Sequence, residues 1–162
     1  MSKLQNFKNN LFLSMYAWSK IPLIGFCAPR VIEAGEQRTV LKVPLNWRTK
    51  NHLGAMYFGA LAIGSELSIA MLAVKKIQES GARIDFLFKD YKAEFLKRAE
   101  GDVHFICEQA QVVVDQINEA KNSTERINRT MTAYAIVPSI STTEKVATFE
   151  LTLSVKNRPR KS

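Results

Sequence analysis

The sequence is poor in the residues that build disulfide frameworks and metal sites. Its 162 residues include only two cysteines and two histidines. Cys27 and Cys107 lie 80 positions apart, which fits neither a disulfide framework nor a metal-binding pair. Both lie among apolar residues, so we expect buried thiols in a reducing compartment and a cytoplasmic location. His52 and His104 match no ligand spacing, so no metal site is predicted.

Motifs that identify several enzyme classes are also missing. The sequence holds no Ser-His-Asp set, no P-loop and no dinucleotide-binding glycine pattern. It has no internal repeat and no low-complexity linker, so we expect one domain over residues 1–162. Near the N-terminus, Asn9-Asn10 and Lys20 interrupt any hydrophobic run, and no signal peptide is expected.

The chain carries an excess of positive charge. Lysine and arginine number 23 against 15 acidic residues, a net charge of +8. Such a balance suits a polyanionic partner, namely nucleic acid, anionic lipid or a phosphate-bearing small molecule, but it is equally typical of an ordinary basic surface. No nucleic-acid motif is present and the lysines are scattered. Neither a nucleic-acid module nor an anionic-membrane module is therefore the favoured function.

One long apolar helix is predicted over residues 57–77, and Gly81 provides its C-terminal signal. Apolar residues occupy nearly every side of it, as in a buried helix. Glu66 and Ser68 interrupt the apolar run and Lys75-Lys76 close it, so no transmembrane segment is predicted. Glu66 is thus a carboxylate inside an apolar helix, where a charge needs a partner, a raised pKa or a chemical role.

Alternation of apolar and polar residues predicts strands before and after this helix. The apolar face changes near Lys89-Asp90, which indicates a bulge or bend within one long strand. Valines make residues 110–121 ambiguous, but their length and polar residues fit a short helix. The remaining expected elements are two strands within 29–45 and strands at 83–98, 103–108, 125–137 and 145–156. This order indicates an α+β domain.

The two ends of the chain differ in character. Residues 1–20 form an amphipathic pattern that predicts a helix ending before Pro22, either packed on the domain, which is favoured, or lying on a membrane surface. Its apolar positions are Leu4, Phe7, Leu11, Met15 and Trp18. The tail at 157–162 is basic, and we expect it to fray.

The stretch from Asn51 to Glu66 resembles the helix-start motif of hotdog-fold acyl thioesterases. That family has an Asn, then His-Gly-Gly, then an acidic residue seven positions after the second glycine. Gly59 matches the second glycine, Glu66 stands at the acidic position, and Asn51 stands six positions before the usual His. Two positions depart from the pattern, because Tyr57 replaces the His and Phe58 replaces the first glycine.

Two further features extend the resemblance. Residues 95–102 are similar to the family's strand that ends in a Leu-Lys-Pro-Ala-like turn, and the element order over about residues 25–157 fits. The extra N-terminal helix resembles the PaaI-like and uncharacterised thioesterase-like subgroups. The resemblance implies a hotdog fold, in which an antiparallel sheet wraps around one long central helix, with an added N-terminal helix at 1–20.

The resemblance also implies hydrolysis of an acyl-CoA or acyl carrier thioester by a homodimer or homotetramer. In the family, the acidic residue of the helix is base or nucleophile and acts across a dimer interface, a role that falls to Glu66. Free N–H groups at the helix start, and a Gly59 without a Cβ, suit an oxyanion contact. Asn51 could orient water or hold the thioester, and the Tyr57 hydroxyl could partly replace the missing His.

Each of these residues also has a purely structural explanation. Glu66 could pair with Lys89 or Arg83, and Asn51 could cap the helix or a turn before it. Gly59 could only permit tight packing. Tyr57 and Phe58 are more often plain core or interface aromatics.

Substrate recognition is the least constrained part of the hypothesis. Phe58, Arg48 and Lys50 are predicted substrate contacts, and Arg158, Arg160 and Lys161 are further candidate phosphate contacts for coenzyme A. All five basic residues fit solvated surface charge equally well. No cofactor beyond the coenzyme A of the substrate is expected. Because of the Tyr57-Phe58 departure, a non-catalytic acyl or acyl-CoA binder on the same scaffold is the alternative.

Overall fold

The computed structural model describes residues 3–158, with side chains from residue 6 onward. Four helices and six strands follow one another in this part of the chain. In order, they are α1 (Lys3–Lys20), α2 (Pro22–Cys27), β1 (Arg30–Ala34), β2 (Thr39–Val43), α3 (Phe58–Ser80), β3 (Ile84–Phe95), β4 (Val103–Cys107), α4 (Ala110–Lys121), β5 (Ile127–Ile136) and β6 (Lys145–Asn157).

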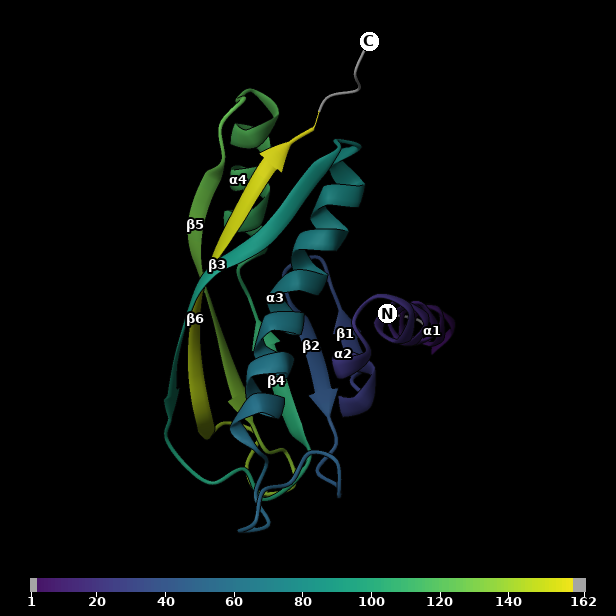
Figure 1. The fold of residues 1–162 in the computed structure, drawn as a ribbon, viewed down its shortest axis with the longest axis vertical. Helices are drawn as coiled ribbons and strands as arrows, with labels where there is room; N and C mark the ends of the chain where they lie inside the picture. Colours follow the sequence, from purple (N-terminus) through teal and green to yellow (C-terminus); the bar gives the residue numbers. More distant parts are fainter. Residues whose placement is uncertain (1–2, 159–162) are drawn as a thin grey trace.

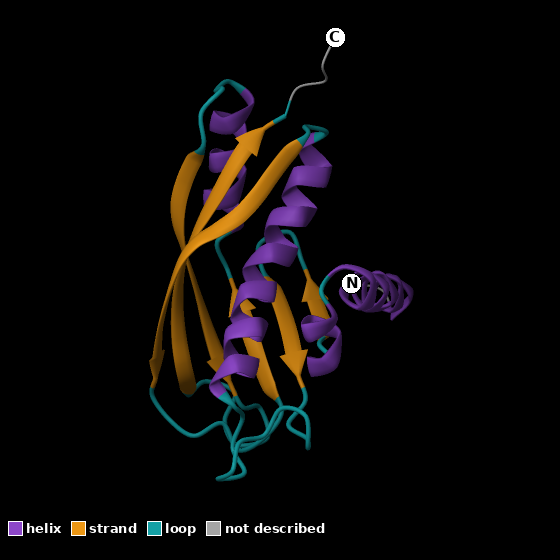
Figure 2. Ribbon diagram, viewed as in Figure 1, coloured by secondary structure: helices purple, strands orange, loops and turns teal. Residues whose placement is uncertain are grey.

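The six strands form one antiparallel sheet in the order β1-β2-β4-β5-β6-β3 (Figure 1). The sheet curves around α3, and α1 and α2 lie beside its β1 end (Figure 2). Residues 110–121 are helical, as their length and polar residues indicated. The register of β3 on β6 shifts between Phe88 and Tyr91, which confirms the bend predicted at Lys89-Asp90. The hotdog arrangement with an added N-terminal helix is therefore confirmed.

The core forms where the sheet closes on α3. Ile69, Leu72 and Ala73 of α3 are fully buried, in one cluster with Phe105 of β4 and with other residues of the sheet. Within residues 3–158, α3 is the one helix long and apolar enough to cross a membrane by length and composition. Half of its most apolar window is buried inside the protein, and the sheet covers this face, so α3 is the core helix of the fold.

Gly64 sets the distance between α3 and the sheet. A Cβ added at Gly64 would lie 2.2 Å from Cε2 of the Phe105 ring, which is itself fully buried. The ring therefore packs directly on the helix backbone. The two cysteines belong to the same interior, and both are buried and unpaired as predicted.

The N-terminal helix packs through a different face from the one predicted. Leu13 and Ala17 are buried, whereas Phe7, Leu11, Met15 and Trp18 of the expected apolar stripe are exposed; the side chain of Leu4 lies outside the described residues. The cause is Asn10, whose side chain accepts a hydrogen bond from the Val31 N–H (2.8 Å) and donates one to the Val31 carbonyl (3.0 Å). These bonds pair the Val31 backbone groups on the outer edge of β1 and orient the helix. Pro22 then begins α2 at its first turn, where a missing N–H costs nothing.

Replacing Gly64 by Ala tests the contact between α3 and the sheet. An unhindered Gly→Ala change in a helix stabilises by about 1 kcal/mol. Here the methyl group would overlap Phe105, and we expect the free energy of unfolding to fall by roughly 1–3 kcal/mol. Urea denaturation followed by circular dichroism measures the change. A stabilised variant would show that the ring does not pack on the helix backbone.

Candidate active site

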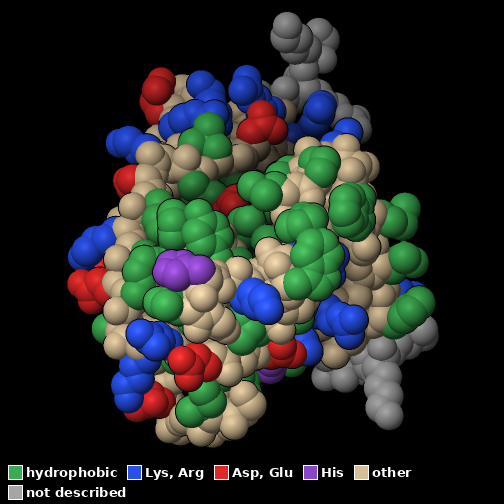
Figure 3. All heavy atoms as spheres, turned by 60° about the horizontal axis from the view of Figure 1, so that its bottom comes forward, with side chains coloured by type: hydrophobic (Ala, Val, Ile, Leu, Met, Phe, Trp, Pro, Cys, Tyr) green, Lys and Arg blue, Asp and Glu red, His purple; other side chains and the backbone are tan. Residues whose placement is uncertain are grey.

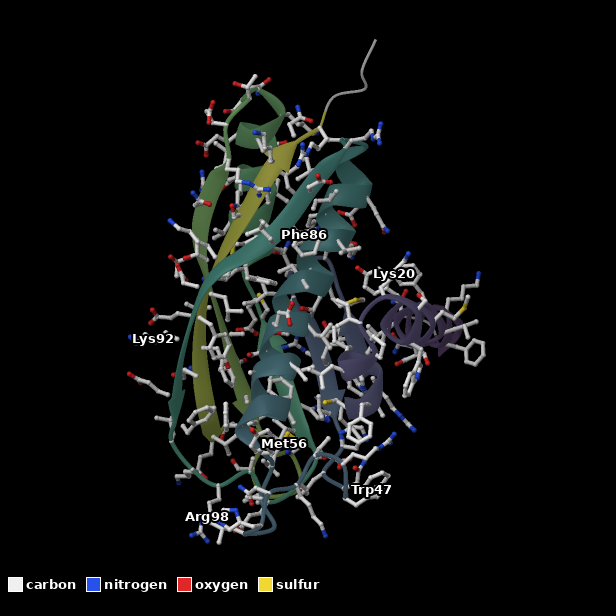
Figure 4. The ribbon with its side chains drawn as sticks, in the orientation of Figure 1. Lys20, Trp47, Met56, Phe86, Lys92 and Arg98 are labelled. Carbon is white, nitrogen blue, oxygen red and sulfur yellow. The ribbon has the colours of Figure 1, made fainter. Side chains whose placement is uncertain are left out.

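Glu66 lies near the middle of α3, on the side that faces strand β3 and the N-terminal helices. Its half-buried side chain lines a cavity of about 640 Å³ between α3, β3 and the N-terminal helices. The walls are mainly apolar, and Figure 4 shows Phe86 of β3 projecting toward α3. Besides Glu66 and Phe86, the lining includes Phe12, Tyr16, Met71, Tyr91 and Leu151.

The Glu66 carboxylate makes no hydrogen bond and no ion pair with any residue in 6–158 that the structure describes. Neither Lys89 nor Arg83 forms an ion pair with it, so Glu66 is not the ion-paired structural carboxylate that the alternative explanation requires. Burial without a compensating partner raises the pKa of Glu66 above its ordinary value. A carboxylate of this kind is poorly solvated and accepts a proton more readily than a surface carboxylate.

Two residues that the sequence interpretation missed complete this cavity. Tyr91 lines it, and its hydroxyl lies 3.3 Å from Oγ of Ser65, the residue before Glu66. Burial raises the pKa of Tyr91, so its hydroxyl stays protonated and can donate. Asp90 accepts a hydrogen bond from the Thr152 N–H (3.0 Å) at the bulge that brings Tyr91 to this face. The change of apolar face at 89–90 was the sequence signal for this bulge.

Three of the other predicted residues lie at the N-terminal end of α3, around a second cavity of about 540 Å³. Figure 4 shows this end of the molecule beside the labels of Met56 and Arg98. Asn51, Tyr57 and Phe58 line the cavity. Oδ1 of Asn51 accepts hydrogen bonds from the N–H groups of residues 53 (2.9 Å) and 55 (3.2 Å), which holds the turn before the helix. Its Nδ2 makes no hydrogen bond within the described part of the chain and can donate to a ligand.

The space beside Gly59 is filled by a neighbouring ring. A Cβ at Gly59 would lie 2.6 Å from Cε1 of Tyr57, so the Tyr57 ring packs on the Gly59 Cα. Tyr57 and Phe58 are 49% and 59% exposed, with ring centroids 4.7 Å apart, so they are surface aromatics. The Tyr57 side chain does not cap the helix. The first N–H groups of α3 therefore donate no hydrogen bond to the Tyr57 side chain.

One protomer does not bring Asn51 and Glu66 together. The two cavities share no lining residue. Glu66 lies eight residues after Phe58, which corresponds to about 12 Å along the helix axis. A thioester carbonyl is far smaller than this separation, so the donors at the start of α3 and the carboxylate of the same protomer cannot act on one carbonyl carbon.

None of the predicted basic contacts that the structure describes lines either cavity. Arg48 lines a groove beside α1 and α2, with its guanidinium 5.8 Å from the ring centres of both Phe26 and Trp47. Lys50 is exposed and pairs through its backbone with Met56. Nε of Arg158 donates to Asp85 at 2.7 Å. Arg160 and Lys161 lie outside the described residues.

The fold is shared with proteins of known structure. A thioesterase from Haemophilus influenzae superposes with a TM-score of 0.63 at 13% identity, covering 88% of this chain and 88% of that chain. A protein of unknown function from Pseudomonas aeruginosa, described as a probable thioesterase, gives 0.75 at 19% identity over 91% and 96%. A protein of unknown function from Chlorobaculum tepidum gives 0.81 at 11% identity over 94% and 97%. At these identities the likeness shows the hotdog fold.

The sequence itself assigns the family. Residues 9–155 match the family described as a domain of unknown function, DUF4442. The match spans most of the chain, and the protein belongs to this family. No curated protein sequence matches the chain.

Replacing Glu66 by Gln tests its burial through stability. The folded-state pKa of Glu66 is raised, so the folded protein holds this proton more tightly than the unfolded chain. Stability of the wild type should therefore fall as the pH rises from the ordinary carboxyl pKa to the raised one, and then level off. We expect the variant to have the higher Tm at neutral pH and an equal Tm in acid.

Thermal melts over a range of pH measure this difference. The exposed Glu125 provides the matched control, because Glu125→Gln removes the same charge at the surface. A Tm difference that is constant with pH, or a wild type more stable at neutral pH, would contradict the proposed burial of Glu66.

Proposed function

We propose that this protein hydrolyses an acyl thioester of coenzyme A or of an acyl carrier, with Glu66 as the catalytic residue. The observation that carries the proposal is an unpartnered carboxylate, with a raised pKa, in the wall of an apolar cavity. Such cavities suit small apolar ligands oriented by a few polar groups. The fold shared with proteins described as thioesterases adds support.

The chemistry follows from the groups available. The acyl chain would occupy the cavity between α3 and β3, which brings its thioester carbonyl to Glu66. The carboxylate takes a proton from water, and the resulting hydroxide attacks the carbonyl carbon to form a tetrahedral oxyanion. Collapse of this intermediate breaks the carbon–sulfur bond, and Glu66 returns its proton to the sulfur, which leaves as a thiol. Direct attack by the Glu66 carboxylate, followed by hydrolysis of the anhydride, uses the same groups.

The oxyanion needs donors that Glu66 does not provide. The start of α3 offers the Gly59 N–H and Nδ2 of Asn51, but these lie about two helix turns from Glu66 of the same protomer. We therefore propose a homodimer in which the helix start of one protomer meets the Glu66 cavity of its partner. The long strand β3 supports such an assembly, because it is at an edge of the sheet and pairs only with β6 within the described chain.

The alternative function is binding of an acyl chain or acyl-CoA without hydrolysis. The observation in its favour is at the helix start, where Tyr57 stands in place of an imidazole and its ring covers Gly59. A protein of this kind would gain thermal stability from acyl-CoA and release no thiol.

Glu66→Gln also tests catalysis. Thiol release from short, medium, long and aromatic acyl-CoAs should show turnover by the wild type, and the variant should lose roughly 100-fold or more in kcat/KM, as expected for removal of a general base. Glu125→Gln should retain the wild-type rate. Equal rates in Glu66→Gln and wild type would remove Glu66 from the mechanism, and stabilisation by acyl-CoA without turnover would favour the binding function.

Mixing two inactive variants tests whether the site is shared between copies. Asn51→Asp keeps the oxygen that holds the turn but removes the Nδ2 donor. A dimer of one Asn51→Asp protomer and one Glu66→Gln protomer would contain one intact site and one doubly altered site. An equal mixture that has exchanged subunits should recover about a quarter of wild-type activity. No recovery, with subunit exchange demonstrated, would place the whole site in one protomer.

A further inference from the structure

The N-terminal helices leave a large part of their apolar side chains in contact with solvent. On α1, Phe7, Leu11, Met15 and Trp18 are 52–66% exposed. They recur at three- and four-residue steps and so project from one side of the helix. Hydrophobic side chains accordingly gather at the right-hand edge of Figure 3, the side on which Figure 1 places α1. This side faces away from Leu13 and Ala17, through which the helix packs.

Neighbouring aromatic residues extend this side of the helix. Trp18 packs against Gly25 of α2, where a Cβ would lie 2.8 Å from its ring. Farther along, the rings of Phe26 and Trp47 meet edge to face at 5.9 Å, and the Arg48 guanidinium lies beside both. Figure 4 shows Trp47 in the loop below α1 and α2. We call these residues, together with Leu23, the N-terminal apolar surface, and its members are Phe7, Leu11, Met15, Trp18, Leu23, Phe26 and Trp47.

This surface is separate from the candidate active site. Other residues of α1, Phe12 and Tyr16, line the Glu66 cavity. Their rings stack on one another at 6.1 Å. No member of the N-terminal apolar surface lines the cavities beside Glu66 or Asn51. The acyl-binding hypothesis therefore does not account for its exposure.

The segment that forms α1 and α2 carries charge of one sign. Residues 1–32 contain no aspartate or glutamate and four basic residues, at positions 3, 8, 20 and 30. The first acids in the sequence are already paired, since Glu33 binds Arg38 and Glu36 binds Lys75 and Lys76. The segment as a whole is therefore basic as well as apolar.

A groove of about 540 Å³ joins the apolar and basic features. It runs between α1 and α2, and Phe7, Trp18, Arg30 and Arg48 all line it. Nε of Arg48 is buried and has no hydrogen-bond partner in the described structure. Arginine pairs with phosphate oxygens through two parallel hydrogen bonds, so this groove suits a phosphate group that enters beside apolar chains.

We propose that the N-terminal apolar surface binds an anionic lipid bilayer, with α1 lying in the plane of the headgroups. Amphipathic helices with basic residues and large apolar side chains bind at this depth, and tryptophan favours the membrane–water interface. A second copy fits less well, because a two-fold contact would bring the same basic surface against itself. An anionic bilayer instead complements the charge. The proposal does not depend on thioester hydrolysis.

Both tryptophans of the chain lie on this surface, so fluorescence reports on it directly. Vesicles of phosphatidylcholine mixed with phosphatidylglycerol should shift Trp18 and Trp47 emission to shorter wavelength, and lipids with brominated chains should quench it. Binding should weaken with salt and should be much weaker to phosphatidylcholine alone. Absence of binding to the anionic vesicles at low salt would overturn the proposal.

Paired variants separate the apolar and electrostatic contributions. Leu11→Ser with Met15→Ser should weaken vesicle binding by about tenfold or more, since each side chain loses its burial in lipid. Ile140→Ser is the control, because Ile140 is 61% exposed in the turn between β5 and β6. Lys8→Glu with Lys20→Glu should weaken binding by more than tenfold, against little change for Lys121→Glu at the end of α4.

The same variants test whether a second copy of the protein, instead of a bilayer, covers this surface. Sedimentation velocity should show that the double variant Leu11→Ser with Met15→Ser has the same oligomeric state as the wild type. If these changes dissociate an oligomer and leave vesicle binding intact, the surface is a contact between copies and the membrane proposal is wrong. Circular dichroism confirms folding, which exposed substitutions of this kind should preserve.

Discussion

Enclosure of α3 by the sheet is the constraint on which the rest of this structure depends. A helix apolar on nearly every side needs extensive burial, and a strongly curved antiparallel sheet covers the half of its most apolar window that is buried here. The fit is tight at Gly64, where the Phe105 ring packs against the helix backbone. Only the side of α3 toward β3 and the N-terminal helices stays open, and the Glu66 cavity forms there.

The chemistry proposed for the protein depends on the absence, in the described part of the chain, of a cationic partner for Glu66 on that open side. Most half-buried carboxylates in proteins gain a cationic partner, and their pKa then falls. Glu66 has none among the described residues, and burial raises its pKa instead. The donors suited to an oxyanion lie at the other end of the helix, beside Asn51 and Gly59. Separation of carboxylate and donors along one rigid helix is the physical reason for the homodimer proposed above.

The N-terminal segment is shaped by a polar contact more than by its apolar pattern. Asn10 binds the free edge of β1, and this contact fixes which side of α1 meets the domain. Leu13 and Ala17 then enter the core, while Phe12 and Tyr16 reach the Glu66 cavity. The apolar side chains of Phe7, Leu11, Met15 and Trp18 stay more than half exposed. A single helix thus bounds the candidate active site and supplies the surface proposed to meet lipid.

Apart from the short helix α2, which was not predicted, the order of helices and strands could be predicted from the chain. So could the bulge in β3 and the isolation of Glu66 in an apolar helix, because each follows from local periodicity or composition. The family motif likewise indicated Asn51 and Glu66. Local pattern could not assign the buried face of α1, since a hydrogen bond between Asn10 and a strand 21 residues later decided it. Nor could it reveal that the Tyr57 ring packs on Gly59, or that Arg48 and Lys50 do not line the Glu66 cavity. Those facts depend on how distant segments meet, and only the folded chain settles them.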